Sequence, residues 1–156
     1  PGTPDCAHCP LSCFCDAYKT GDAAELPILS KTKPPREIPW SVLLIHSGDR
    51  VLMRLRTENL LHGLWCFPML EGHLSMEEIR TQAENKWHLT LCSLSRAGHA
   101  RHVFTHQVWN MCLYQADAEA FASAPDGYSF VPISHLKELP LPTAMNAAVS
   151  LLTLPA

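Results

Sequence analysis

A proline-rich segment divides this chain into a short cysteine-rich part and a longer apolar part. Residues 19–39 hold four prolines, and four of the seven cysteines lie upstream, within residues 6–15. Because proline fixes φ and has no backbone N–H to donate, such a segment is typical of an extended linker. The sequence therefore predicts three parts: a cysteine-rich segment at 1–18, a linker at 19–39 and one globular domain at 40–156.

The globular part mixes strand and helix patterns in irregular order. Residues 40–46 and 51–55 are apolar runs separated by a Ser-Gly-Asp-Arg turn, which predicts a β-hairpin. Ser75 and Glu78 form a capping box that starts a helix ending near Lys86. Further strands are expected at 89–94, 101–105, 108–115 and 128–131, followed by a helical turn at 134–139 and a closing helix from Thr143 to Leu152. This order predicts an α+β fold with a mixed or antiparallel sheet and flanking helices.

Composition limits the class of protein. Hydrophobic residues make up 47% of the 156 residues, enough for the core of one domain. The net charge of -3 argues against a strong stand-alone nucleic-acid binder, but it allows DNA contact through a local patch. No apolar run reaches the length of a membrane span and no signal peptide is visible, so no membrane partner is expected. Cys66, Cys92 and Cys112 lie in apolar runs and are predicted to be buried, reduced core cysteines.

The spacing of the first cysteines indicates a metal or cluster site. Cys6, Cys9 and Cys15 supply three thiolates with the spacing Cys-x2-Cys-x5-Cys, and Cys13 is a candidate fourth ligand. Thiolates are soft ligands that suit zinc or iron–sulfur clusters. The alternative is a loop of free cysteines, which the density of thiols in this short stretch makes less favourable.

A polar turn at Phe104, Thr105 and His106 separates two of the predicted strands. Its hydroxyl can both donate and accept a hydrogen bond, so the turn is a candidate recognition element. For Phe104, the alternative role is core packing. For His106, the alternative role is a structural hydrogen bond. Elsewhere, the sequence offers three arginines as candidate contacts to DNA phosphates, with a solvent-facing role as the alternative: Arg54, Arg56 and Arg101.

Taken in order, these motifs resemble MutY-type adenine DNA glycosylases. The cysteine spacing matches the end of that family's iron–sulfur loop, Cys-x6-Cys-x2-Cys-x5-Cys, whose first cysteine would lie upstream of Pro1. The resemblance continues in the family's order through residues 51–56, 61–68, 102–106 and 139–145. Each motif is weak alone, but the ordered set covers nearly the whole chain and is specific.

The resemblance implies a protein of base excision repair that removes adenine mispaired with 8-oxoguanine. The catalytic groups would lie on a helical N-terminal half that this chain lacks, so the chain alone is expected not to excise adenine. Residues 1–18 would be the truncated end of the [4Fe–4S] loop, with Cys6, Cys9 and Cys15 as ligands and the cluster absent, incomplete or replaced by zinc. Residues 40–156 would form a Nudix-like domain that recognises 8-oxoguanine.

The same resemblance implies that Phe104, Thr105 and His106 lie at the lesion, where many family members have serine in place of Thr105. 8-Oxoguanine differs from guanine by an O8 acceptor and an N7–H donor, and one hydroxyl can donate to the first and accept from the second. We expect Thr105 to discriminate the lesion, Phe104 to orient the turn, and His106 to support it or touch a phosphate. The expected partner is double-stranded DNA containing 8-oxoguanine:adenine, bound by a monomer in a bacterial, nucleoid-associated cytoplasmic setting.

Two other functions fit parts of the sequence. A stand-alone Nudix-related hydrolase of an oxidised nucleotide would need Gly-x5-Glu-x7-Arg-Glu-x2-Glu-Glu to hold magnesium. Aligned on Gly72, that pattern meets Glu78, but no carboxylate stands at the later glutamate positions within residues 86–91. A protein-interaction module, docking a partner such as a sliding clamp, is permitted by the linker but supported by no specific motif.

Overall fold

The computed structural model describes residues 3–28, 34–119 and 123–153 and contains two compact units, Pro1–Pro34 and Pro35–Ala156. The first unit holds a 3₁₀ turn, η1 (Ser12–Phe14), and a short helix, α1 (Asp16–Thr20). Gly21 ends this helix in the left-handed region, at φ +80°, which glycine adopts without steric cost. None of the described residues of this unit is fully buried, so they form no apolar core of their own.

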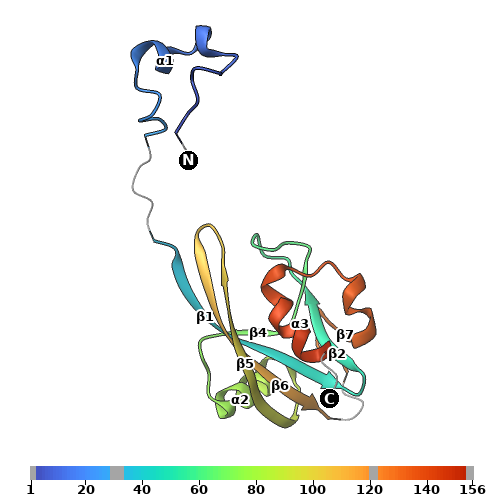
Figure 1. Ribbon diagram of the computed structural model, residues 1–156. Coiled ribbons are helices and arrows are strands. Elements are labelled where there is room, and N and C mark those ends of the chain that lie inside the picture. The colour runs from blue at the N-terminus through green and yellow to red at the C-terminus, as the bar shows by residue number, and fades with distance from the viewer. Residues whose placement is uncertain (1–2, 29–33, 120–122, 154–156) are drawn as a thin grey trace. The chain divides into compact units, whose positions relative to one another are not determined.

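The second unit is built on a seven-stranded mixed sheet with the order β3-β2-β1-β6-β5, to which β4 adds beside β1 and β7 beside β2 (Figure 1). The strands are β1 (Arg36–Ser47), β2 (Arg50–Leu55), β3 (Trp65–Cys66), β4 (Met69–Glu71), β5 (Leu91–Val103), β6 (Gln107–Ala118) and β7 (Tyr128–Pro132). Strand β1 is central: it pairs antiparallel with β2 and β4 and parallel with β6. The unit is therefore α+β with a mixed sheet, as predicted.

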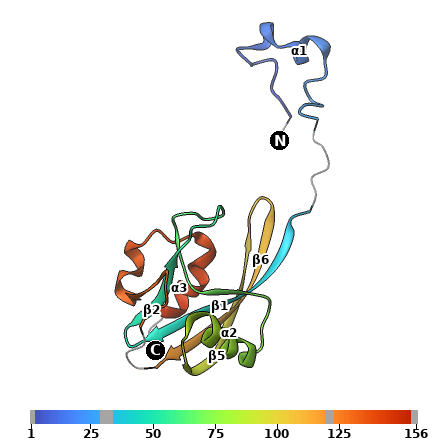
Figure 2. The ribbon, with the colours of Figure 1, turned by 180° about the vertical axis from the view of Figure 1, so that it is seen from behind.

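Helices cover both faces of the sheet, and α2 lies on the opposite side from the C-terminal helices (Figures 1 and 2). These elements are α2 (Met76–Trp87), η2 (Ile133–Glu138), η3 (Thr143–Met145) and α3 (Asn146–Thr153). One core joins the even residues of β1, such as Val42 and Leu44, to the C-terminal helices, and the other joins its odd residues to α2. This division explains why the middle of β1 is apolar on both faces, a pattern typical of a strand covered on both sides.

Several strand boundaries differ from the sequence prediction. Strand β1 begins at Arg36, inside the segment predicted as linker, because its parallel ladder with β6 starts at the pair Arg36–Gln107. The strands predicted at 89–94 and 101–105 are one strand, β5, whose polar residues face outward at the edge of the sheet. Two irregularities interrupt its pairing with β6, between Leu91 and Ser93 and between Arg96 and Gly98. Such bulges bend a strand without ending it.

The irregularity between Leu91 and Ser93 explains why the predicted burial of one cysteine, Cys92, was wrong. Cys66 and Cys112 are buried as predicted, but Cys92 is exposed. Cys92 is the extra residue between the pairs Leu91–Ala118 and Ser93–Asp117, so it has no partner that turns it inward. Burial raises the pKa of the Cys66 thiol above its ordinary value, which keeps it protonated.

Local helix signals are confirmed at α2. Ser75 Oγ accepts a hydrogen bond from the Glu78 N–H (3.3 Å), and Glu78 Oε2 accepts one from the Ser75 N–H (2.8 Å). At the other end, His88 has a left-handed φ of +52° and its N–H bonds the carbonyls of Ala83 and Glu84. At the C-terminal end, Thr143 begins a 3₁₀ turn rather than capping a helix through its side chain. Among the helices within the described ranges, none is long and apolar enough to cross a membrane.

Candidate functional site

The predicted polar turn lies at the tip of the hairpin formed by β5 and β6. The last strand pair is Val103–Val108, and the Phe104 N–H closes the turn by donating to the Gln107 carbonyl at 2.8 Å. On the outer side, the Arg36 N–H donates to the His106 carbonyl at 3.1 Å, which ties the turn to β1. Thr105 and His106 are exposed. The backbone is thus held from two sides while Thr105 is exposed to solvent.

Phe104 anchors the turn to the core. Its ring packs edge-on against Trp109, at 4.9 Å between centroids, and against His102, at 4.5 Å. Trp109 is 1% exposed and in turn packs against Trp40 at 5.7 Å. Such edge-to-face contacts stabilise aromatic clusters beyond the area that they bury. These contacts pack Phe104 in the core and hold the turn against it, and a role of Phe104 at a lesion remains a prediction.

A pocket of about 450 Å³ opens beside the turn and is lined by Leu60, Val103, Phe104, Thr105, His106 and Gln107. We call it the turn pocket. Its volume lies in the range of about 300–1,000 Å³ that is usual for small-molecule sites. Leu60 reaches it from the loop between β2 and β3, which sequence reasoning did not assign to the site. The pocket combines an apolar wall with one exposed hydroxyl, which suits a flat base that offers hydrogen-bonding edges.

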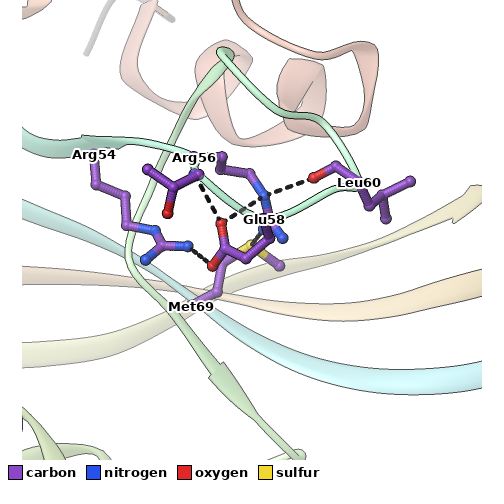
Figure 3. A network of polar contacts seen from close by, with 6 residues as sticks. Arg54, Arg56, Glu58, Leu60 and Met69 are labelled. Carbon is purple, nitrogen blue, oxygen red and sulfur yellow. Dashed lines mark hydrogen bonds and ion pairs between the residues drawn. The ribbon is translucent and has the colours of Figure 1, made fainter.

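A buried arginine holds that loop in place (Figure 3). Arg56 is 8% exposed, its Nε donates to the Leu60 carbonyl at 3.2 Å, and its guanidinium lies 5.5 Å from the Trp109 ring centroid. A cation over an aromatic face is attracted by the ring quadrupole, most strongly where water is excluded. Arg56 thus joins the Leu60 wall of the turn pocket to the aromatic stack beneath Phe104.

Glu58 completes the network. It accepts a hydrogen bond from Arg54, and one of its oxygens lies 3.6 Å from the Arg56 Nε (Figure 3). Burial raises the pKa of the Glu58 carboxyl, but a backbone hydrogen bond, the bond from Arg54 and the two positive charges outweigh it, so the pKa lies below its ordinary value. Glu58 therefore stays ionised at neutral pH and neutralises part of the charge of both arginines.

The three predicted phosphate contacts have different surroundings. Arg56 is buried and Arg54 is paired with Glu58, which favours structural roles for both. Arg101 is exposed on β5. The structure brings Phe104, Thr105 and His106 together in one turn, with Arg101 on the adjoining strand β5 and Arg56 bound to the loop that lines the turn pocket.

The cysteine-rich unit contains the four cysteines as free thiols, with Cys6 and Cys15 half-buried and Cys9 and Cys13 exposed. Within the part of the chain that the structure describes, no group of three or more His, Cys, Asp or Glu side chains is arranged to hold a metal ion. As they lie, these thiols do not form a ligand set, and Cys6, Cys9 and Cys15 remain predicted ligands. The surroundings of His99, His102 and His106 on the hairpin likewise offer no such group.

The helix α2 lies where a magnesium-binding glutamate pattern would be expected. The alignment on Gly72 places the three glutamate positions at Trp87, Thr90 and Leu91; Trp87 and Leu91 are buried, and the last two lie beyond the helix. These positions do not supply the clustered carboxylates that a hard cation prefers.

Comparisons with known proteins agree on the fold. Residues 41–151 match the family model described as the NUDIX domain. A MutT NUDIX hydrolase from Burkholderia pseudomallei is similar, with a TM-score of 0.61 and 18% identity over 76% of this chain and 99% of that chain. The C-terminal domain of mouse MUTYH, solved in complex with human PCNA, is also similar, with a TM-score of 0.60 and 20% identity over 74% of this chain and 87% of that chain. The NUDIX domain of Shewanella oneidensis NrtR, solved with ADP ribose, has a TM-score of 0.55 and 15% identity over 83% of this chain and 95% of that chain.

Proposed function

Since this chain belongs to the NUDIX domain family, we propose that it is the 8-oxoguanine-recognition domain of a MutY-type adenine DNA glycosylase. One observation carries the proposal: an exposed hydroxyl, Thr105, stands at a hairpin tip beside a pocket, on a turn anchored by Phe104. The likeness of the fold to the C-terminal domain of mouse MUTYH and the ordered motifs of the resemblance support the same choice.

The chemistry of the turn pocket fits this role. With 8-oxoguanine, the Thr105 hydroxyl can accept from N7–H and donate to O8; guanine has no O8 and offers N7 only as an acceptor. One hydrogen bond is therefore lost with guanine. A net hydrogen bond is worth about 0.5–1.5 kcal/mol, which corresponds to a preference of roughly 2- to 13-fold from this residue alone.

Hydrolysis of an oxidised nucleotide has no such support. MutT-type hydrolases share the fold, but a shared fold does not determine function. In this chain the glutamate positions of the magnesium pattern, aligned on Gly72, hold Trp87, Thr90 and Leu91. The binding role therefore accounts for more of the molecule than the hydrolytic one.

Fluorescence anisotropy with matched duplexes tests the proposal. The chain is titrated with 8-oxoguanine:adenine and guanine:adenine duplexes at one fixed salt concentration, because phosphate contacts make affinity depend on salt. Thr105→Ala should lower the preference for the lesion by about 2- to 13-fold, whereas Thr105→Ser, which keeps the hydroxyl, should retain it. Thr90→Ala removes an exposed hydroxyl just before β5, at the end of that strand away from the turn, and should change nothing. A preference that survives Thr105→Ala unchanged would contradict the role of Thr105.

A further inference from the structure

A second pocket lies on the other face of the β5–β6 hairpin. It has a volume of about 450 Å³, and Cys112, which packs in the core beneath α2, forms part of its lining. Phe104 of the turn pocket packs instead in the core on the opposite face of the sheet. We call this second site the basic pocket; its charged and polar lining residues are His73, Arg96, His99, Arg101 and Asn110.

Strand register brings these side chains to one face. His99 pairs with Cys112 and Arg101 with Asn110, so alternate residues of β5 point to the same side. Arg96 lies over Cys112, with its Nη2 3.6 Å from the Cys112 Sγ. From the loop before α2, the His73 Nε2–H donates to the Asn110 carbonyl at 3.0 Å, which fixes one edge of the pocket.

The basic pocket concentrates positive charge in a chain whose net charge is -3. Two guanidiniums and two imidazoles line it, and none of its lining residues is acidic. The carboxylate of Glu37 reaches the lining only by accepting from the Asn110 Nδ2 at 3.2 Å. Guanidinium groups offer several donors in a planar fork that matches phosphate oxygens. The chemistry of the basic pocket is therefore that of a phosphate site.

We propose that the basic pocket binds a backbone phosphate of the DNA duplex that carries the lesion. The identity of that duplex rests on the proposed function. Arg101 precedes Thr105 by four residues, two in strand β5 and two in the turn, so the two positions lie at most about 13 Å apart. The rise of a duplex is about 3.4 Å per nucleotide of one strand, so the tip and the basic pocket reach positions up to about four base pairs apart on one duplex.

The salt dependence of binding to an undamaged duplex tests this site directly. The measurement compares the wild-type chain with the double variant Arg96→Gln/Arg101→Gln over about 50–200 mM salt. Loss of one phosphate contact should reduce the slope of log K against log salt by about one, and weaken damaged and undamaged duplexes by the same factor. Arg50→Gln removes an exposed arginine at the turn between β1 and β2 and should leave the slope unchanged. An unchanged slope and affinity in the double variant, with a wild-type melting profile, would overturn the proposal.

The two functional claims fail separately. Thr105→Ala should alter lesion preference and keep the salt slope, whereas the double variant should alter the slope and keep the preference. A wild-type chain with no lesion preference, but with the predicted loss of slope in the double variant, would refute lesion reading and support the phosphate site. A competition arm with dGTP distinguishes the source of the phosphate: if dGTP binding depends on Arg96 and Arg101 while duplex binding does not, the assignment to DNA is wrong.

Discussion

At the scale of single residues, Arg56 connects two segments that are distant in the sequence. Its guanidinium donates a hydrogen bond to the carbonyl of Leu60, a residue in one wall of the turn pocket. The same guanidinium lies over Trp109, which packs against Phe104 in another wall of that pocket. A buried charge is stable only when it is paired and hydrogen bonded, and Glu58 and the Leu60 carbonyl provide both. Lysine could not reproduce this arrangement, because an ammonium lacks the planar fork of a guanidinium.

Replacement of Arg56 should therefore cost stability. We expect Arg56→Met to lower the free energy of unfolding by about 1–3 kcal/mol, since it removes a charge-assisted hydrogen bond and the contact with Trp109. Arg54→Met is the matched control: Arg54 shares Glu58, but its side chain is 27% exposed, and such partly exposed pairs contribute about 0–1 kcal/mol. Urea unfolding of the three proteins measures the difference. Equal losses of unfolding free energy in the two variants would show that the contacts of Arg56 with Trp109 and Leu60 do not stabilise the fold.

At the scale of elements, the start of α2 shows how one helix is fixed by local chemistry. Ser75 and Glu78 satisfy each other's backbone N–H groups, and Ile79, Ala83 and Trp87 then bury one face against the sheet. The backbone and hydroxyl hydrogen bonds from Ser75 lower the pKa of the Glu78 carboxyl below its ordinary 4.5. The ionised form of Glu78 is thus the one that the folded state favours.

This lowered pKa predicts a pH dependence. Because the folded pKa lies below the unfolded one, the contribution of Glu78 is present above about pH 4.5 and is lost as pH falls through the folded value. Glu78→Gln cannot ionise, so it should be less stable than wild type at neutral pH, and the two should converge in acid. Glu77→Gln is the control, in the same helical turn but outside the capping box. Urea midpoints measured from about pH 7 to pH 3 decide it; a gap for Glu78→Gln that stays constant across this range would contradict the account.

The hairpin of β5 and β6 is the element on which both proposed sites depend. Its tip forms one wall of the turn pocket, and its middle forms most of the basic pocket on the opposite face. The two faces differ because successive residues of a strand point to opposite sides. His102 packs on Phe104 on one face, whereas His99 and Arg101 line the basic pocket on the other. One rigid ladder can therefore hold a lesion-reading group and a phosphate-binding group at a fixed separation.

At the scale of the whole molecule, the sequence predicts what is local and misses what is distant. The β1–β2 hairpin, the capping box and the Phe104–His106 turn each depend on a few adjacent residues, and all three form. The pairing of β1 with β6 depends on how the chain returns to itself, so no short pattern indicated it. For the same reason, Leu60 and the Arg56–Trp109 contact were not assigned to the turn pocket, and neither the burial of Arg56 nor the pairing of Arg54 with Glu58 was predicted.

The distribution of charge also emerges only in three dimensions. The net charge of -3 speaks against a basic nucleic-acid-binding domain, and no run of basic residues marks the sequence near β5. Folding gathers Arg96, His99 and Arg101 with His73 from another segment into one pocket. A weakly acidic protein can in this way offer a local site for phosphate.

The most direct test of the central claim is an NMR titration of the isotopically labelled chain with two duplexes that differ only in 8-oxoguanine or guanine opposite adenine. The account predicts lesion-dependent shifts for the amide signals of the turn pocket, at Thr105, His106, Gln107 and Leu60, together with shifts at Arg96 and Arg101 that both duplexes share. Identical spectra with the two duplexes, or lesion-dependent shifts confined to residues outside the turn pocket, would contradict the conclusion that this turn recognises 8-oxoguanine.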